Sequence, residues 1–158
     1  MIERPDDIEV VETGDGSKTL HDRQRGLHYR STHGARNESN HVFVDGTGLV
    51  DNPAPWTVLE LGFGAAVNFT GTVAALEPED ALVYHAVECA PVDPEHIDFH
   101  DGVAGAAARD ALRRVEHAGH TVRVDTEGGR IELHLHVIEW SEFQRPQLQA
   151  DAVYFDPF

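Results

Sequence analysis

The stretch WTVLELGFGAAVN, residues 56–68, decides the fold of this chain. Its first six residues form an apolar run that ends at Leu61 and predicts a buried β-strand. Gly62 and Gly64 then predict a tight turn into a helix, where glycines let the backbone approach a ligand and the helix start offers unpaired N–H groups. Such a turn is often only a tight strand-to-helix connection, so its meaning depends on the residues around it.

The segments on both sides of this turn predict an α/β fold. Turn residues and periodicity indicate, in chain order, a hairpin over residues 8–20, a helix capped by Ser31-Thr32 that ends near Gly46, the strand 56–61, a helix over 65–76, a strand over 81–88, a helix over 101–118, a hairpin over 121–137 broken at 127–129, and a strand over 152–155. Strands that alternate with helices in this way are typical of a doubly wound, Rossmann-like sheet. We therefore expect an N-terminal hairpin and helix extension over residues 1–54, and a Rossmann-like core over residues 55–158 that stops after its fourth core strand.

Composition is that of a single globular domain. The chain has 158 residues, of which 41% are hydrophobic, and this is enough to form a core. No apolar run approaches the roughly 20 residues of a membrane span, and the N-terminus has no signal-peptide core. The single cysteine, Cys89, cannot form an internal disulfide. We expect a cytoplasmic protein without a membrane partner.

The charge of the chain is strongly acidic, with 28 Asp and Glu residues against 12 Lys and Arg residues. Lys18 is its single lysine. A formal net charge of −16 opposes the binding of polyanions, because neutralisation of phosphates normally supplies most non-specific affinity. Recognition of a nucleic acid therefore cannot be inferred from net charge and has to come from motifs or from parts outside this sequence.

Acidic residues near the glycine turn indicate which cofactor it would hold. Glu60, two residues before the first glycine, favours S-adenosylmethionine over a dinucleotide, because an ammonium group needs a carboxylate and not a pyrophosphate cradle. Glu88 ends the next strand, where a carboxylate can accept both ribose hydroxyls, although an isolated acid there is often only solvated. The candidate cofactor-binding residues are Glu60, Gly62, Phe63, Gly64, Asn68 and Glu88, with Glu139 and Trp140 as candidates for the adenine edge, where an ordinary surface role is equally open.

The residues Asp156-Pro157-Phe158, directly after the last apolar strand, predict the chemistry. Methylation of an amine requires a nitrogen lone pair held in line with the sulfonium methyl group, so a hydrogen-bond acceptor and an aromatic wall are the parts needed. This triplet resembles the Asp/Asn-Pro-Pro-aromatic motif of amino methyltransferases, with one proline fewer. By itself, Asp-Pro after a strand is a common turn.

A longer resemblance covers the chain from Gly16 to its end. The segment LHYRSTHGARNESNHVFV, residues 27–44, with Gly48-Leu49 after it, resembles the corresponding region of the MnmD/MnmC-type tRNA 5-methylaminomethyl-2-thiouridine methyltransferases. The glycine turn and residues 151–158 resemble two further motifs of that family. The family belongs to the class I, S-adenosylmethionine-dependent methyltransferases, and the segment 27–44 is the most specific part of the match.

This resemblance implies methylation of the 5-aminomethyl nitrogen of wobble uridine in tRNA, with S-adenosylmethionine as cofactor. It places Asp156 at the catalytic aspartate, and it implies that the substrate is bound by His33, Glu38, Ser39, His41 and Phe158. Fused members of the family also carry an FAD-dependent oxidase domain, for which this chain has no room. The resemblance therefore implies a stand-alone methyltransferase, with a separate FAD-dependent enzyme acting earlier in the pathway.

Two departures separate the chain from the family pattern. Ala65-Ala66 stands where the family has Thr-Gly, which removes the third glycine of the turn. The chain also stops at Phe158, and on the family pattern we expect it to be C-terminally truncated. Two alternatives stay open: a methyltransferase for another amine or nucleobase, and a non-catalytic module that binds S-adenosylmethionine.

The eleven histidines raise the question of a metal site. His96 and His100 could share a helix face, and His134 and His136 share a strand face. No cysteine or acid joins either pair at a ligand spacing, so we expect no metal.

Overall fold

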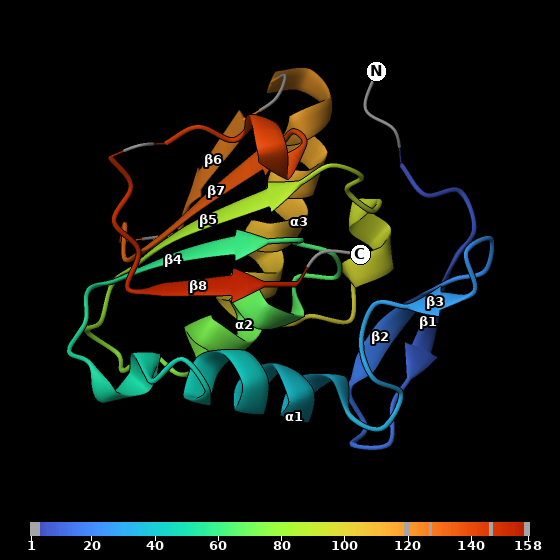
Figure 1. Ribbon diagram of the computed structural model, residues 1–158, viewed down its shortest axis with the longest axis horizontal. Helices are drawn as coiled ribbons and strands as arrows, with labels where there is room; N and C mark the ends of the chain where they lie inside the picture. Colours follow the sequence, from blue (N-terminus) through green and yellow to red (C-terminus); the bar gives the residue numbers. More distant parts are fainter. Residues whose placement is uncertain (1–3, 119–120, 127, 146, 157–158) are drawn as a thin grey trace.

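The protein has two β-sheets and a group of helices (Figure 1). Its structure is a computed structural model that describes residues 4–118, 121–126, 128–145 and 147–156. The strands are β1 (Ile8–Glu12), β2 (Lys18–Asp22), β3 (Leu27–His28), β4 (Trp56–Leu61), β5 (Leu82–Glu88), β6 (Thr121–Asp125), β7 (Ile131–Val137) and β8 (Ala152–Phe155). The helices are α1 (Ala35–Ser39), the π-helix η1 (Asn40–Asp45), α2 (Val67–Ala74), α3 (Gly102–Ala118) and the short 3-10 turns η2 (Leu49–Asp51), η3 (Pro94–Ile97) and η4 (Trp140–Glu142). Within the described residues, no helix is long and apolar enough to cross a membrane.

The central sheet has the strand order β6-β7-β5-β4-β8. Strands β7, β5, β4 and β8 run parallel, whereas β6 pairs antiparallel with β7 as the predicted hairpin. The strand and helix pattern of an α/β protein is thus confirmed, but the sheet is mixed and not uniformly parallel. The order reverses between β4 and β8, because the chain moves outward through β5 and β7 and then returns to pair on the other side of β4.

The carboxyl ends of the four parallel strands meet at one edge. Leu61 at the end of β4 pairs with Val87 on one side and with Phe155 on the other, and Glu88 pairs with Val137. This edge faces the small sheet of β1, β2 and β3, as the strand arrows in Figure 1 show. Ligands of open α/β sheets bind outside this edge, at the point where the strand order reverses.

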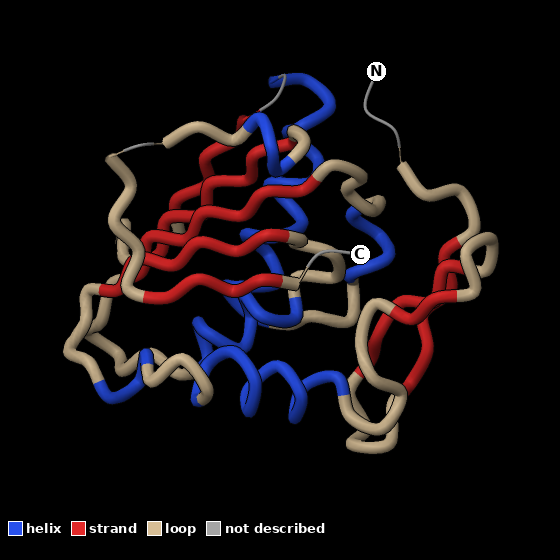
Figure 2. The backbone as a smooth tube through the Cα atoms, in the orientation of Figure 1, coloured by secondary structure: helices blue, strands red, loops and turns tan. Residues whose placement is uncertain are grey.

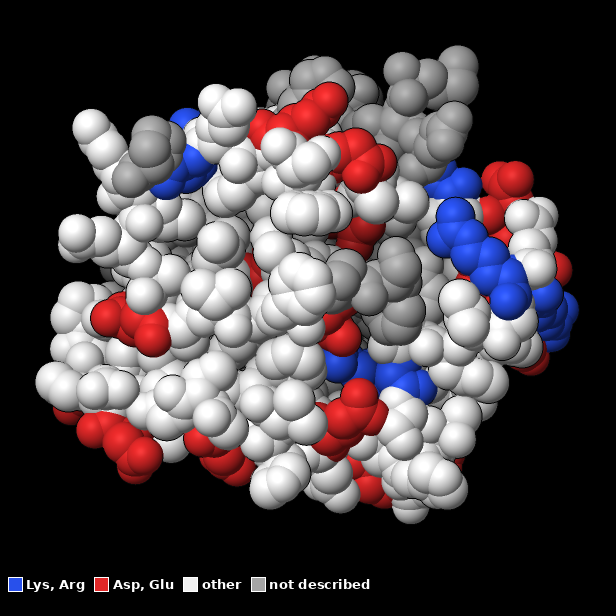
Figure 3. Space-filling view, viewed as in Figure 1, with Lys and Arg blue, Asp and Glu red and all other residues white. Residues whose placement is uncertain are grey.

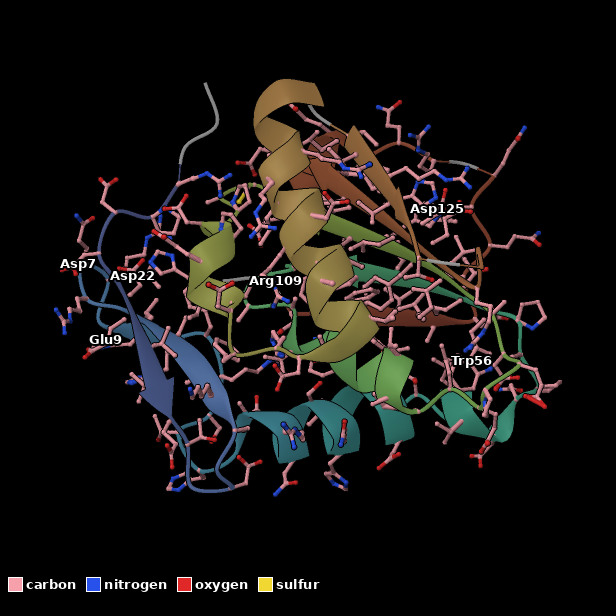
Figure 4. The ribbon with its side chains drawn as sticks, turned by 180° about the vertical axis from the view of Figure 1, so that it is seen from behind. Asp7, Glu9, Asp22, Trp56, Arg109 and Asp125 are labelled. Atoms are coloured by element: carbon pink, nitrogen blue, oxygen red, sulfur yellow. The ribbon has the colours of Figure 1, made fainter. Side chains whose placement is uncertain are left out.

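The two faces of the central sheet differ in how they are covered. Alternate residues such as Val58, Tyr84 and Leu133 are buried beneath α2 and α3, which lie behind the sheet in Figure 1 and in front of it in Figure 4. The opposite face carries less buried side chains, among them Val153, which is 53% exposed. The connection from β7 to β8 near this face is mostly loop (Figure 2).

The N-terminal extension contains the predicted hairpin and one further strand. Strands β1 and β2 pair antiparallel, and β3 adds a third strand that the sequence did not predict. The predicted helix is present as α1 continued by η1, and it ends at Gly46 as expected.

The cap predicted for this helix was wrong, because Ser31-Thr32 does not cap it. The N-cap position is Gly34, and no side chain caps the helix locally. Instead the turn between β1 and β2 folds against the helix start. The hydroxyls of Thr13 and Ser17 accept the N–H groups of Ala35 and Arg36 at 3.3 and 3.1 Å, and the carboxylate of Asp15 accepts that of Asn37 at 3.0 Å. These bonds satisfy N–H groups that a helix start leaves unpaired, and so they tie the helix to the hairpin.

Candidate active site

The turn after β4 has three residues with a positive φ angle, although the third is an alanine. Gly62 and Gly64 have positive φ angles of 96° and 49°, and Ala66 has a φ of 60° and is completely buried. A left-handed conformation costs an L-residue about 1–2 kcal/mol, which glycine avoids. Ala66 therefore occupies the conformation for which the family pattern has glycine, and it stores strain at the start of α2.

Glu88 lies directly beside this turn. One oxygen of its carboxylate accepts the N–H of Gly64 at 2.9 Å, and the other accepts the N–H of Ala90 at 2.9 Å. Each carboxylate oxygen can accept a second hydrogen bond, so both oxygens still have capacity for ligand hydroxyls. The structure thus brings two predicted cofactor residues, Glu88 and Gly64, into direct contact.

Tyr29 lies close to Glu88 and was not among the predicted site residues. It follows β3, and its backbone N–H donates to the carbonyl of Leu20 at 2.8 Å. Burial, reinforced by the charge of Glu88, raises the pKa of Tyr29 to about 12. Its phenol is therefore neutral, and Tyr29 lines the small cavity at the glycine turn.

Asp156 lies at the end of β8, on the other side of the glycine turn. Its N–H donates to the carbonyl of Leu61 at 2.9 Å, and its carboxylate forms an ion pair with Arg30. Arg30 is 7% exposed, lies 3.7 Å from Glu38, and stacks its guanidinium over the ring of Phe43 at 4.9 Å. Burial raises the pKa of Asp156 to about 6, although the charge of Arg30 acts in the opposite direction.

A buried polar network continues from Asp156 into the core. Asn68 donates to Glu60 at 2.8 Å and accepts from Ser39 at 2.6 Å, and a further hydrogen bond to Asn68 lowers the pKa of Asp156. Tyr84 donates to the second oxygen of Glu60 at 2.9 Å. Four predicted residues, Ser39, Glu60, Asn68 and Asp156, are thus joined through one amide, and Glu38 reaches them through Arg30.

Glu60 has no exposed surface, so its carboxylate faces this network and not the open edge of the sheet. Burial raises its pKa to about 8, against the effect of its hydrogen bonds from Asn68 and Tyr84. The carboxylates next to the turn that keep accessible surface are those of Glu88 and Asp156. A role for Glu60 toward a ligand stays a prediction.

His100 contacts the backbone of the glycine turn at Ala65. Its Nε2 lies 2.7 Å from the carbonyl oxygen of Ala65, and burial lowers its pKa, so the neutral ring donates this hydrogen bond. Arg109 of α3, labelled in Figure 4, donates to the carbonyl of His100 at 2.6 Å and lies 3.6 Å from Asp98. The sequence drew attention to His100 only as a possible metal ligand.

Other predicted site residues lie apart from this network. His33 is exposed in the turn before α1, and His41 is exposed on η1. Trp140 is 60% exposed, with the exposed Glu139 beside it, past the end of β7. Glu139 lies near Cys89, whose pKa burial raises with help from Glu88 and Glu139. Phe158 lies outside the described residues.

The two histidine pairs considered for a metal lie on different elements: His96 on η3 and His100 in the loop before α3, and His134 and His136 on β7. His134 and His136 stack with His85 on the less covered face of the sheet, with ring centroids 4.4 Å apart for His85 and His134. Burial and the neighbouring imidazoles hold the pKa values of His85 and His136 at about 4. Across the described part of the chain, no group of three or more His, Cys, Asp or Glu residues is arranged to hold a metal ion.

Arg30 and Tyr29 are the main site residues that sequence reasoning missed. Both lie inside the segment 27–44 that carries the family resemblance, and that position was the available signal. A buried arginine that pairs with Asp156 could not be found from spacing, because 126 positions of chain separate the two residues.

Comparison with known proteins identifies relatives of this chain. No protein-family model matches it. The tRNA 5-methylaminomethyl-2-thiouridine biosynthesis bifunctional protein MnmC of Paracidovorax citrulli is 32% identical over 133 residues, which cover 77% of this chain and 21% of the relative. The MnmC protein of Ralstonia nicotianae is 34% identical over 147 residues, 82% of this chain and 22% of the relative. The chain therefore spans about a fifth of the length of these curated relatives.

A solved structure agrees with the fold. The crystal structure of MnmC2 from Aquifex aeolicus superposes with a TM-score of 0.67 at 23% sequence identity, and the match covers 95% of this chain and 49% of that one. At this identity the likeness shows the fold alone.

Proposed function

This chain is homologous over most of its length to one part of the MnmC proteins, and we propose that it is an S-adenosylmethionine-dependent methyltransferase for the 5-aminomethyl group of wobble uridine in tRNA. The observation that carries the proposal is the position of Asp156. It is a partly buried carboxylate at the reversal point of the sheet, beside the same glycine turn that Glu88 contacts. The proposed class is the Rossmann-like, class I methyltransferase.

Asp156 suits the handling of an amine. A protonated aminomethyl group has no lone pair, so the site has to take the neutral amine or remove its proton. A pKa near 6 leaves Asp156 mostly ionised at neutral pH, and a partly buried carboxylate can orient the N–H bonds and stabilise the cation that forms. Glu38 and Ser39 reach Asp156 through Arg30 and Asn68 and would form the inner wall of the acceptor site.

The residues at the turn fit a nucleoside cofactor. Glu88 would accept the ribose hydroxyls, and Glu139 and Trp140 lie past the neighbouring strand end where an adenine edge would be met. S-adenosylmethionine, when bound, supplies the methyl group. The cavity bounded by Tyr29, Arg30, the glycine turn and Asp156 measures about 10 Å³, room for about one water molecule. This volume is too small to hold S-adenosylmethionine, so the cofactor would lie mostly outside this cavity, along the edge of the sheet that Glu88 reaches.

Two parts of the chain would contribute residues to the proposed site. We assign residues 55–158 to the cofactor-binding core and residues 1–54 to an extension that supplies Tyr29, Arg30, Glu38 and Ser39 to the site. The curated relatives are bifunctional by name, and this chain matches about a fifth of their length. Oxidation by an FAD-dependent enzyme would then be carried by a separate polypeptide or a separate domain.

The experiment is methyl transfer from labelled S-adenosylmethionine to two tRNA preparations. One carries the 5-aminomethyl group at the wobble uridine, and the matched control has the same sequence with unmodified uridine. The proposal expects label in the first only, recovered as the 5-methylaminomethyl nucleoside after digestion and mass spectrometry. Label in both preparations would favour another nucleobase, and cofactor binding without transfer would favour a non-catalytic module. Absence of cofactor binding would contradict the proposal.

A further inference from the structure

A hollow of about 380 Å³ lies beside helix α2. Four segments line it: the turn before β2, helix α1 with η1, helix α2, and the loop before α3. Their side chains with polar ends include Lys18, Arg36, Asn40, Thr70 and His100. Val67, at the start of α2, lines both this hollow and the small cavity next to Asp156. The two sites are therefore separated by the first turn of a single helix.

Two cations in the hollow lack the partners that most others have. Arg23, Arg25, Arg114 and Arg123 each pair with an acidic side chain. Lys18 and Arg36 form no ion pair and no side-chain hydrogen bond with any described residue, and both are exposed. In a chain with 28 acidic residues, two unpaired cations in one concave site are available for an external anion.

Other charges around the hollow are engaged elsewhere. The carboxylate of Asp15 accepts hydrogen bonds from Ser17 and from the N–H of Asn37, which hold its pKa well below its usual range. The ring of His100 is held at the carbonyl of Ala65. Asp101 is the acidic side chain at the rim, and it is exposed to solvent. The free donors that face the hollow are thus the ammonium group, the guanidinium group and the amide of Asn40.

We propose that this hollow binds a phosphate group of the tRNA backbone, an inference that rests on the proposed function. A guanidinium fork matches phosphate oxygens, and a lysine adds a point charge. The net charge of −16 cannot hold RNA by general attraction, so phosphate contacts have to be concentrated where cations are free. Figure 3 shows no continuous basic surface on the face that it presents. The Lys and Arg side chains, in blue, form small groups there that are separated by acidic and uncharged residues.

The test compares two double variants of equal charge. Lys18→Ala with Arg36→Ala removes the two cations of the hollow, and Arg113→Ala with Arg114→Ala removes two exposed cations of α3 as the matched control. Affinity for the aminomethyl tRNA is measured by fluorescence anisotropy between about 50 and 300 mM KCl. The hollow variant is expected to bind at least about tenfold more weakly at the low salt. Its slope of log affinity against log salt should fall by about 2, and the control should stay close to the unmodified protein.

Inorganic phosphate serves as a second probe, which distinguishes binding of a free anion from binding of RNA. The expected result is a shift of the backbone amide NMR signals of Asn40 and Thr70 with phosphate, and the loss of that shift in the hollow variant. Equal loss of tRNA affinity in both double variants would overturn the inference. Phosphate binding without any effect on tRNA affinity would overturn the assignment to RNA. If the unmodified protein does not bind tRNA, the proposed function fails as well, whereas tRNA binding that both variants retain would overturn this inference alone.

Discussion

Arg30 forms an ion pair with Asp156 across the gap between the end of β3 and the end of β8. The same guanidinium lies 3.7 Å from Glu38 and over the ring of Phe43. The N-terminal extension therefore supplies the positive charge that keeps the carboxylate of the sheet edge ionised. A partly buried acid without this partner would hold its proton to a higher pH.

Asp156→Ala should lower turnover on aminomethyl tRNA by roughly two orders of magnitude or more, the range expected when a positioning or acid–base group is removed. Cofactor affinity should change little, because in the proposed site Glu88 and the glycine turn would bind the cofactor. The exposed Asp125 on β6, labelled in Figure 4, provides the control variant Asp125→Ala. Near-normal turnover of Asp156→Ala would show that the carry-over from the family is wrong.

Arg30→Met should move the acidic limb of the turnover–pH profile to higher pH. With Arg30 present, Asp156 has a pKa of about 6, so turnover should decline as the pH falls through 6 and the carboxylate gains a proton. Loss of the guanidinium removes an effect that lowers this pKa, and the limb should rise by about one unit. Arg30→Lys keeps the charge and should keep most of the original profile. A limb that stays in place in Arg30→Met would show that Arg30 has only a structural role.

Glu88→Ala should weaken S-adenosylmethionine binding about tenfold or more, because two hydrogen bonds to a charged group are lost. Isothermal calorimetry measures this directly, with circular dichroism to confirm that the turn still folds without the carboxylate at Gly64. The control is Glu79→Ala, because Glu79 is exposed and lies before the start of β5, at the other end of that strand from Glu88. Unchanged affinity in Glu88→Ala would remove Glu88 from the cofactor site.

Ala66→Gly should stabilise the protein relative to Ala65→Gly by about 1 kcal/mol or more. Ala66 has a left-handed backbone with a φ of 60°, which glycine adopts without strain, whereas Ala65 has no positive φ. Both side chains are buried, so the lost methyl group affects the two variants similarly. Chemical denaturation of both variants gives the comparison. Equal stabilities would mean that Ala66 is not strained.

Glu60→Gln should gain stability relative to the unmodified protein as the pH rises. The folded pKa of Glu60, about 8, lies above its unfolded value. Its contribution to stability is therefore complete at low pH and is lost as the pH rises through 8. Glutamine keeps the size without the charge, so the difference in unfolding free energy should grow by more than about 1 kcal/mol between pH 5 and pH 9. The exposed Glu139→Gln should show no such trend, and a pH-independent difference for Glu60→Gln would contradict the prediction.

Local signals in the sequence determined the order of the strands and helices. The apolar run before Gly62, the hairpin break at 127–129 and the strand before Asp156 are readable because periodicity and turn residues act over a few positions. The same signals predicted that Glu88 and Asp156 lie at one edge of the sheet, because the carboxyl ends of parallel strands meet there. The homology to MnmC agrees with the resemblance of residues 27–44.

Tertiary structure alone decided the contacts between distant segments. The cap of α1 comes from Asp15 and its neighbours in the hairpin turn, which no signal next to the helix could indicate. Glu60 is enclosed because Asn68 and Tyr84 converge on it, although its position before the glycines is equally compatible with an open carboxylate. Periodicity shows which face of a helix or strand is apolar, but it does not show which charged side chain a distant segment places there. The pairing of Arg30 with Asp156 depends on such a contact between distant segments, so it could not be predicted from the sequence.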